Sequence, residues 1–274
     1  MKPTVHTAAT QVWRNGRMQD GARAIPDETP VAISYNGSTQ AVMMATPADL
    51  EDFAIGFSLS EGVVARADQI ESLEIVPHDD GVELRMWLGG AIADRLQQRR
   101  RHIAGPTGCG LCGVDSIAEA VRPVAIVGKG RTFSPQQIIA AIDAMPPLQT
   151  LNVATRAVHA AAYYTPTLGV VALREDVGRH NALDKLAGAI TRQGIDTTGG
   201  LVLLTSRVSV EMVQKTAALG ATVLVAVSAP TALAVKMAEA AGITLAAIAR
   251  SDGFEIFTHP HRIDTQHKGA ADVA

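Results

Sequence analysis

The fold class of the chain is decided by the stretch Leu201-Val-Leu-Leu-Thr-Ser-Arg-Val-Ser-Val-Glu-Met-Val-Gln-Lys-Thr-Ala-Ala-Leu-Gly-Ala-Thr-Val-Leu-Val-Ala-Val227. Residues 201–204 and 222–227 are largely apolar runs whose length is that of a buried strand. A helix predicted from Ser209 to Gly220 joins them. A strand, a helix and a second buried strand in succession are typical of a parallel sheet with right-handed crossovers. The stretch therefore predicts an α/β fold.

The same alternation continues on both sides of this stretch. We predict helices at residues 181–193 and 231–241, and strands at 153–164, 168–173, 243–249 and 254–257. Another helix is expected to open at Ser134, with Gln137 as its capping partner. The predicted domain covers residues 116–258 and holds a mixed or largely parallel sheet with flanking helices. Residues 259–274 are expected to be a polar tail.

A smaller unit is predicted before this domain. Two hairpins, turning at Asn36-Gly37 and Asp79-Asp80-Gly81, flank a helix that is expected to open at Thr46-Pro47 with Asp49 in its cap. Residues 27–102 are therefore expected to form a small α+β subdomain. Residues 1–26 show no sustained period, so we predict an extended N-terminal arm there.

The composition of the chain argues against two classes of binding partner, nucleic acid and membrane. Hydrophobic residues make up 47% of the 274 residues, which is enough for a substantial core. The formal net charge is -3 and only 4% of the residues are aromatic, so we expect no nucleic-acid partner. No signal peptide and no apolar run of membrane-spanning length is visible. We therefore expect a cytoplasmic protein with no membrane partner.

Residues 103–115 are predicted to be a flexible loop that carries the chain's two cysteines, Cys109 and Cys112. Glycines follow both cysteines, and Gly108 immediately precedes the first, which disfavours helix and regular strand. Two thiols at this spacing are typical of sulfur chemistry, redox exchange or half of a metal site.

Of these, a metal site is the least favoured. A structural zinc needs four ligands, and His159 is the best nitrogen ligand that remains once the two cysteines are counted. No His-x-Glu precedes Cys109 and no proline abuts it, so the zinc deaminase signature is absent as well. We expect no metal held by protein ligands. The surrounding glycines suit a mobile carrier better than a rigid redox centre.

A second candidate site is the polar block Leu173-Arg-Glu-Asp-Val-Gly-Arg-His-Asn-Ala-Leu-Asp-Lys185, at a predicted strand-to-helix junction. Such junctions bind ligands in open α/β sheets, and a helix start offers N–H groups to an anion. Asp184 and Lys185 are also compatible with a solvated helix face. Arg207, before another helix, suits a phosphate, whereas residues 249–253 alone read as an ordinary turn.

Four blocks in this order resemble the formate dehydrogenase accessory sulfurtransferase family (FdhD). They are Phe53-Ala-Ile-Gly-Phe-Ser-Leu-Ser-Glu-Gly62, Cys109-Gly-Leu-Cys-Gly113, Arg174-Glu-Asp-Val-Gly-Arg-His-Asn-Ala-Leu-Asp-Lys185 and Val225-Ala-Val-Ser-Ala-Pro-Thr-Ala-Leu-Ala-Val235. The resemblance covers most of residues 27–258. It implies a cytidine-deaminase-like α/β domain without the deaminase zinc.

The resemblance also implies a function. Members of the family move sulfur from a cysteine desulfurase to the bis-molybdopterin guanine dinucleotide molybdenum cofactor, which then enters formate dehydrogenase. By this resemblance Cys109 carries the persulfide, with Cys112 as its partner. The implied contact segment for the cofactor consists of Ile248, Ala249, Arg250, Ser251, Asp252 and Gly253. From the polar junctions we add Asp176, Gly178, Arg179, His180, Asn181 and Arg207 as cofactor-binding candidates.

The chain departs from the family pattern at three places. Gly108 stands where hydroxyl residues are typical, Thr155-Arg-Ala157 replaces Thr-Gly-Gly, and Thr205-Ser-Arg207 replaces Ser-Gly-Arg. The last two changes add bulk near the expected site and bear on cofactor affinity and client identity. Two alternatives stay open: a thiol-disulfide oxidoreductase that uses both cysteines, and a cofactor chaperone without sulfur transfer. We also expect a homodimer, because the ligand is large and anionic and each molecule has only one such loop to bind it.

Overall fold

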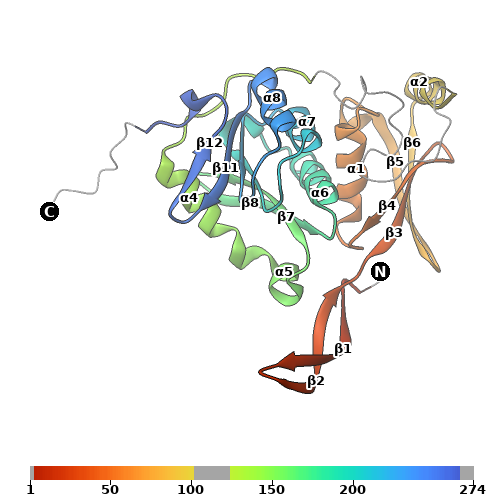
Figure 1. Ribbon diagram of the computed structural model, residues 1–274. Helices are drawn as coiled ribbons and strands as arrows, with labels where there is room; N and C mark the ends of the chain where they lie inside the picture. The colour runs from red at the N-terminus through yellow and green to blue at the C-terminus, as the bar shows by residue number, and fades with distance from the viewer. Residues whose placement is uncertain (1–2, 102–123, 266–274) are drawn as a thin grey trace. The chain divides into compact units, whose positions relative to one another are not determined.

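The computed structural model describes residues 3–101 and 124–265 of the chain (Figure 1). The predicted cysteine loop, with Cys109 and Cys112, lies outside the described residues. The chain divides into two compact units. Unit 1 comprises Met1–Arg122, Gln149–Ala160 and Arg174–Gln193. Unit 2 comprises Pro123–Leu148, Ala161–Leu173 and Gly194–Ala274.

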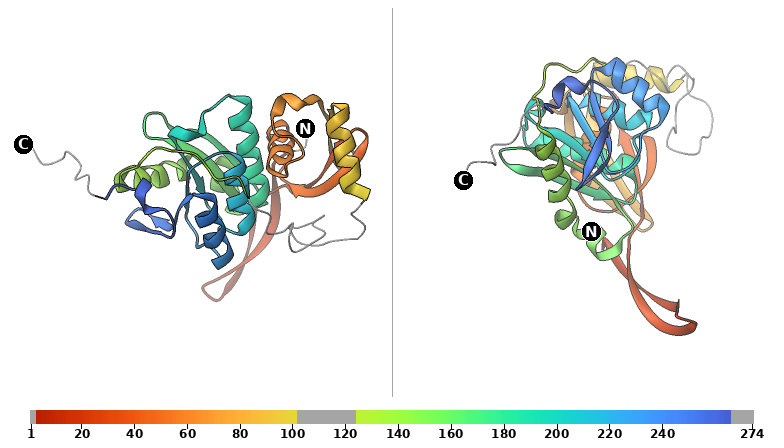
Figure 2. Two further views of the ribbon diagram at one scale, coloured as in Figure 1. Left: turned by 90° about the horizontal axis from the view of Figure 1, so that it is seen from above. Right: turned by 60° about the vertical axis from the view of Figure 1, so that its left-hand side comes forward.

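Unit 1 begins with a two-stranded hairpin where an extended arm was predicted. Strands β1 (Val5–Arg14) and β2 (Arg17–Pro26) pair antiparallel over their whole length and project from the rest of their unit (Figures 1 and 2). Asn15 and Gly16 connect them with positive φ values of 51° and 76°, as a two-residue hairpin turn requires. The sequence does contain this Asn-Gly signal, but the strands lack the apolar alternation of a half-buried hairpin.

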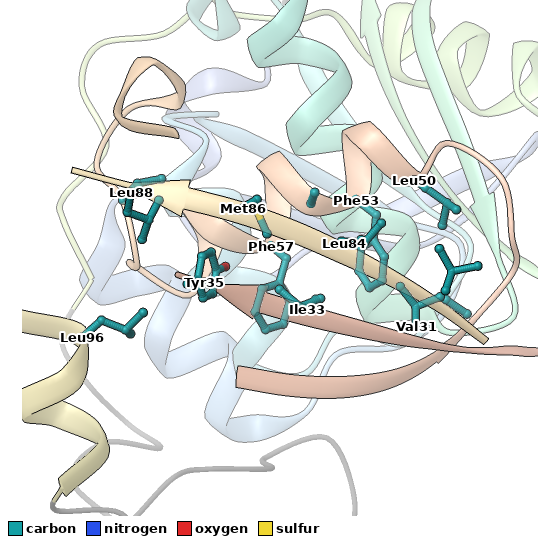
Figure 3. Packing of buried hydrophobic residues seen from close by; sticks show 14 residues of the cluster. Val31, Ile33, Tyr35, Leu50, Phe53, Phe57, Leu84, Met86, Leu88 and Leu96 are labelled. Atoms are coloured by element: carbon teal, nitrogen blue, oxygen red, sulfur yellow. The ribbon is translucent and has the colours of Figure 1, made fainter. Parts of the chain in front are cut away.

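The core of unit 1 forms between a four-stranded sheet and one helix. The sheet order is β4 (Ser38–Ala45), β3 (Thr29–Tyr35), β6 (Gly81–Leu88) and β5 (Ile70–His78), which confirms both predicted hairpins. Strands β3 and β6 pair in parallel with each other and so connect the two hairpins into one sheet. Apolar side chains of β3 and β6 pack against Phe53 and Phe57 of α1 (Leu50–Ser60), as Figure 3 shows. Unit 1 also holds η1 (Ala67–Gln69) and α2 (Gly90–Arg101).

The start of α1 differs from the prediction. The helix begins at Leu50, and Asp49, with φ of 52°, caps it without a side-chain hydrogen bond. Thr46 was expected to cap the helix, but its hydroxyl accepts instead from the Val177 N–H at 3.1 Å. Its own N–H donates to Asp176. A contact distant in sequence thus takes the group that the local pattern assigned to the cap.

Helix α6 (Arg179–Arg192) crosses α1 at close range within unit 1. Two glycines permit this approach. A Cβ built on Gly56 would lie 1.7 Å from the Asp184 carbonyl oxygen, and one on Gly188 would lie 1.9 Å from that of Asp52. This packing explains why residues 174–193 belong to unit 1, although the predicted boundaries placed them in the domain 116–258.

The predicted strand 153–164 is wrong in its first part. Residues Thr150–Thr155 form helix α5, and strand β7 begins only at His159 and runs to Thr165. The Glu175 carboxylate accepts from the Leu151 and Asn152 N–H groups, both at 2.8 Å, and so stabilises the helix start. This carboxylate is more than 20 residues away in sequence, so no local pattern could predict the helix.

Unit 2 is built on a mixed sheet that matches the predicted α/β class. The strand order is β12 (Gly253–Ile256), β11 (Thr244–Arg250), β10 (Val223–Ala226), β9 (Leu201–Leu204), β7 and β8 (Gly169–Asp176). The central strands β9, β10 and β11 are parallel, whereas β7 and β12 run antiparallel to their neighbours. Every residue of β9 and β10 is buried, as the apolar runs predicted.

Helices and 3₁₀ turns complete unit 2. Helix α4 (Pro135–Ala144) has the predicted Ser134–Gln137 capping box, and α8 (Ala232–Ala241) is capped by Thr231. Helix α7 spans Val210–Ala218. The 3₁₀ turns are η2 (Pro146–Leu148), η3 (Thr197–Gly199) and η4 (Pro260–Arg262). No helix among the described residues is both long and apolar enough to cross a membrane.

Candidate functional site

The polar block at the β8–α6 junction centres on the buried carboxylate of Asp176. One of its oxygens accepts from the Gly178 N–H at 2.7 Å and from the Asn181 amide at 2.9 Å. The other oxygen meets the ammonium group of Lys185 at 2.6 Å and accepts from the Thr46 N–H at 3.0 Å. Asp176 and Lys185 both have 0% of their side chains exposed. A charge pair so deeply buried is stable only because further hydrogen bonds satisfy it.

The remaining donors of this cluster reach the end of β4 and the segment after it. Lys185 donates to the Thr46 carbonyl at 2.8 Å, and its ammonium lies 5.8 Å from the centre of the Phe53 ring. The Asn181 amide also donates to the Met44 carbonyl at 2.8 Å. The cluster therefore ties the start of α6 to the first sheet.

Burial changes the roles expected for four residues of the block. Asp176 and Asn181 were predicted to contact the cofactor, but they are buried among protein groups and hold the junction in place. Asp184 and Lys185 do not form a solvated helix face: Asp184 accepts from the Ser60 hydroxyl at 2.6 Å, and both residues are buried. Asp176 holds the Gly178 N–H directly, and Asn181 and Lys185 hold Asp176 in place.

The segment Gly178–His180 presents positive charge at the start of α6. Gly178 is the N-cap, and Arg179 and His180 are the first two helical residues. Although the Nε of Arg179 is shielded from solvent, it has no hydrogen-bond partner among the described residues. A helix start beside an unsatisfied guanidinium nitrogen favours an anionic ligand.

His159 belongs to the same electrostatic environment. Burial lowers its pKa, the charge of Arg179 lowers it further, Asp176 opposes this change, and His180 adds to it. The imidazole is therefore neutral near pH 7 and can donate or accept one proton in a hydrogen bond. The sequence indicated His159 only as a zinc ligand. Among the described residues no group of three or more His, Cys, Asp or Glu side chains could hold a metal ion.

The candidate ligand-binding residues of unit 2 lie around the loop that follows β10. Val208, next to Arg207, exchanges backbone hydrogen bonds with this loop, at Ala229 and Thr231. The Arg250 guanidinium donates to the Val227 and Ala249 carbonyls. Arg207 and Arg250 thus lie at the carboxyl edge of the parallel strands, where open α/β sheets bind ligands.

The predicted contact segment 248–253 has an unusual backbone. Ile248 adopts a φ of 55°, which is strained for a β-branched residue, and it lies in a register shift between β11 and β12. Its N–H donates to the Ser228 carbonyl. Ala249 is buried, and the Ser251 hydroxyl donates to Asp143 at 2.7 Å. Asp252 is exposed at the turn and Gly253 opens β12.

The comparisons with known proteins agree with the resemblance read from the sequence. The model of the FdhD/NarQ family matches residues 26–264. The chain belongs to the FdhD/NarQ family. It is 55% identical to the sulfur carrier protein FdhD of Agrobacterium fabrum, over 93% of this chain and 94% of that protein. It is 48% identical to the protein of that name from Cupriavidus necator, over 98% and 92% of the two chains.

A solved structure extends this likeness to the fold. A protein from Desulfotalea psychrophila, assigned as a formate dehydrogenase accessory protein, superposes with a TM-score of 0.77 at 25% identity. The alignment covers 96% of this chain and all of that one. The FdhD/NarQ match includes both cysteines, the β8–α6 block and the Arg250 turn, so every candidate group lies inside the family region.

One family departure has a direct structural consequence. Arg156 ends helix α5 in the left-handed conformation, with a φ of 58°, at a position where the resemblance read from the sequence implies glycine. A side chain at such a position is strained by about 1 kcal/mol relative to glycine. We expect Arg156→Gly to raise the free energy of unfolding by about 0.5–1 kcal/mol in urea titrations. Arg156→Ala is the control: it removes the charge but keeps the strain, so equal gains in both variants would contradict the backbone argument.

Proposed function

We propose that this chain is a sulfur carrier that serves the maturation of formate dehydrogenase in the cytoplasm. In this proposal it takes sulfur from a cysteine desulfurase and delivers it to the bis-molybdopterin guanine dinucleotide molybdenum cofactor, its substrate. The observation that carries the proposal is the 55% identity to a sulfur carrier protein FdhD over 93% of the chain. Cys109 and Cys112 lie within the family region and supply the thiols that sulfur transfer requires.

The first step is a persulfide exchange. The Cys109 thiolate attacks the outer sulfur of the desulfurase persulfide, a new S–S bond forms at Cys109, and the desulfurase cysteine leaves as a thiolate. No external oxidant or reductant is needed, since one S–S bond replaces another.

The second step needs two electrons, because the outer sulfur must leave as sulfide. Cys112 supplies them: its thiolate attacks the Sγ of Cys109, the persulfide bond breaks, and a Cys109–Cys112 disulfide remains. The sulfide goes to molybdenum, and a dithiol reductant restores the two thiols for the next cycle.

Two basic groups support binding of a substrate with several phosphates. Arg179 offers charge at the start of α6, and Arg207 and Arg250 offer it at the strand edge of unit 2. Guanidinium groups and helix N–H groups are the usual partners of phosphate. Phosphate binding is therefore assigned to the arginines of each unit separately, and Cys109 and Cys112 act on the molybdenum.

The proposal is tested by mass spectrometry of the full chain after incubation with desulfurase and cysteine. We expect one added sulfur on Cys109 in the wild type and in Cys112→Ala, and none in Cys109→Ala. In a client assay Cys109→Ala should abolish activation of formate dehydrogenase, and Cys112→Ala should stop after the persulfide stage.

Two results would favour the alternatives instead. Turnover of a disulfide substrate without any added sulfur on Cys109 would indicate a thiol-disulfide oxidoreductase. Full activation of the client by Cys109→Ala would indicate a chaperone that delivers the cofactor without sulfur transfer.

A further inference from the structure

The turn between β11 and β12 is held in a conformation that its own residues do not favour. Ile248 has a φ of 55° although it is β-branched, and the ladder between the two strands shifts its register between Ala247 and Arg250. Such backbone strain persists only where neighbouring groups hold it, and it is concentrated at functional sites. The groups that hold residues 248–253 therefore bear on the function of this turn.

Two of these groups come from the loop that follows β10. The Ile248 N–H donates to the Ser228 carbonyl at 3.3 Å, and the Arg250 guanidinium donates to the Val227 carbonyl. Both acceptors are backbone groups at the carboxyl edge of the parallel strands, so these contacts fix the base of the turn. Neither contact reaches Ser251, which lies at the tip of the turn and is exposed.

The tip of the turn is held from helix α4 by Asp143. The Ser251 hydroxyl donates to the Asp143 carboxylate at 2.7 Å, across 108 residues of sequence. Helix α4 is placed for this contact by its apolar side chains, because Ile138 and Ile142 belong to the same buried cluster as Ala249 of β11. Asp143 directly follows Ile142 and is itself exposed. The apolar cluster thus fixes α4 against β11, and the hydrogen bond fixes the tip of the turn.

Neither helix stability nor anion binding explains a carboxylate at this position. Asp143 is the last residue but one of α4, where its charge faces the carbonyl end of the helix dipole, and the last turn has no basic residue to offset it. The charge also lies beside Ser251, the neighbour of Arg250, and Arg250 is assigned to phosphate binding. By electrostatics alone Asp143 would weaken the binding of an anion. A carboxylate that is unfavourable in both respects needs another role, and its hydrogen bond with Ser251 provides one.

We propose that Asp143 is a positioning residue for the turn 248–253, which it holds in the conformation that binds the nucleotide end of the cofactor. The inference rests on the proposed function, in which Arg250 of this turn binds a phosphate of the cofactor. Asp143 acts through Ser251 and does not contact the ligand itself. Without this hydrogen bond the strained backbone at Ile248 relaxes, and the Arg250 guanidinium loses its place at the sheet edge.

Calorimetric titration of the full-length chain with GDP, the guanosine diphosphate portion of the cofactor, tests the inference with two variants. Asp143→Ala removes both the acceptor and the charge, whereas Asp143→Asn removes the charge and keeps an oxygen that can accept from Ser251. We expect Asp143→Ala to raise the dissociation constant for GDP about fivefold to tenfold, as the loss of one positioning hydrogen bond predicts. Asp143→Asn should bind GDP at least as tightly as the wild type. A purely electrostatic role predicts instead that both variants bind GDP more tightly.

Two further measurements separate positioning from folding. Because the carboxylate is unfavourable near the end of α4, Asp143→Ala should unfold at the same urea concentration as the wild type or at a higher one. Hydrogen exchange followed by mass spectrometry should be faster at residues 248–253 in Asp143→Ala and unchanged in Asp143→Asn. Ser251→Ala removes the donor and should speed the exchange equally, and the double variant Asp143→Ala/Ser251→Ala should add nothing further.

Gln136→Ala is the matched control, because Gln136 is an exposed polar residue of the same helix. It should change neither GDP binding nor hydrogen exchange in the turn. If Asp143→Ala binds GDP as tightly as the wild type or tighter, or if Asp143→Asn binds it as weakly as Asp143→Ala, the inference is overturned and the proposed function stands. A wild-type chain that binds no GDP would instead overturn the assignment of the cofactor to this turn, and the role of Asp143 in binding with it.

Discussion

Lys185→Met is expected to lower the free energy of unfolding by about 3–5 kcal/mol, because it leaves the Asp176 carboxylate buried without its counter-charge. The two side chains are 0% exposed and their charged atoms lie 2.6 Å apart. Methionine fills a similar volume, so the loss comes from the missing charge and not from a cavity. Urea unfolding followed by circular dichroism measures it.

The double variant Asp176→Asn/Lys185→Met separates charge from shape. It removes both charges together, and the asparagine oxygen can still accept from the Gly178 N–H, which now donates to Asp176 at 2.7 Å. We therefore expect it to recover a large part of the loss. Lys236→Met, on an exposed position of α8, is the control and should change stability by less than about 0.5 kcal/mol. A Lys185→Met variant no less stable than this control would show that the pair contributes nothing.

The position of this pair links stability to the proposed site. Asp176 fixes Gly178, and Gly178 precedes Arg179, which is assigned to phosphate binding. The same cluster reaches Thr46 and the end of β4. Loss of the pair should therefore loosen the start of α6 before it affects the rest of unit 1.

The parallel centre of the unit 2 sheet could be predicted from sequence because its signals are local. The runs 201–204 and 223–226 are apolar throughout, and helices between strands carry their own caps, such as Thr231 and Gly242 of α8. Strand and helix periods of this kind depend only on neighbouring residues. The two hairpins of the four-stranded sheet in unit 1 were predictable for the same reason.

The predictions of secondary structure were wrong where residues distant in sequence decide the local structure. Thr46 failed to cap α1 because Asp176 and Val177 occupy its N–H and hydroxyl. Helix α5 was missed because the carboxylate that stabilises its start belongs to Glu175. No window of neighbouring residues contains these partners.

The candidate site shows the same limit. The polar block at the β8–α6 junction was found from its density of charged residues, but the sequence could not separate buried supports from exposed contacts. Asp176 and Asn181 are buried, whereas the Nε of Arg179 has no hydrogen-bond partner in the part of the chain that the structure describes. His159 is the first residue of β7, and the fold brings it into the electrostatic environment of Arg179. Its lowered pKa depends mainly on burial, which only the structure reveals.

Gly56→Ala is expected to destabilise the chain by about 3 kcal/mol or more, because the added methyl group has no space between α1 and α6. Its Cβ would lie 1.7 Å from the Asp184 carbonyl oxygen and 2.7 Å from the Gly188 nitrogen. Both are backbone atoms, so a rotamer change cannot relieve the overlap and the helices must separate. Gly188→Ala should act similarly, since its Cβ meets the Asp52 backbone at 1.9 Å.

Gly90→Ala provides the matched control for this prediction, because Gly90 is also helical and nothing lies within 4 Å of a Cβ built there. Alanine favours a helix over glycine by about 1 kcal/mol, so this control should be neutral or more stable. Thermal unfolding of the three variants compares them directly. Because separation of α1 from α6 would also shift Arg179, nucleotide binding should fall in Gly56→Ala and remain in Gly90→Ala. Equal stability of Gly56→Ala and Gly90→Ala would show that the helices can move apart without loss, and that the close crossing does not hold the site.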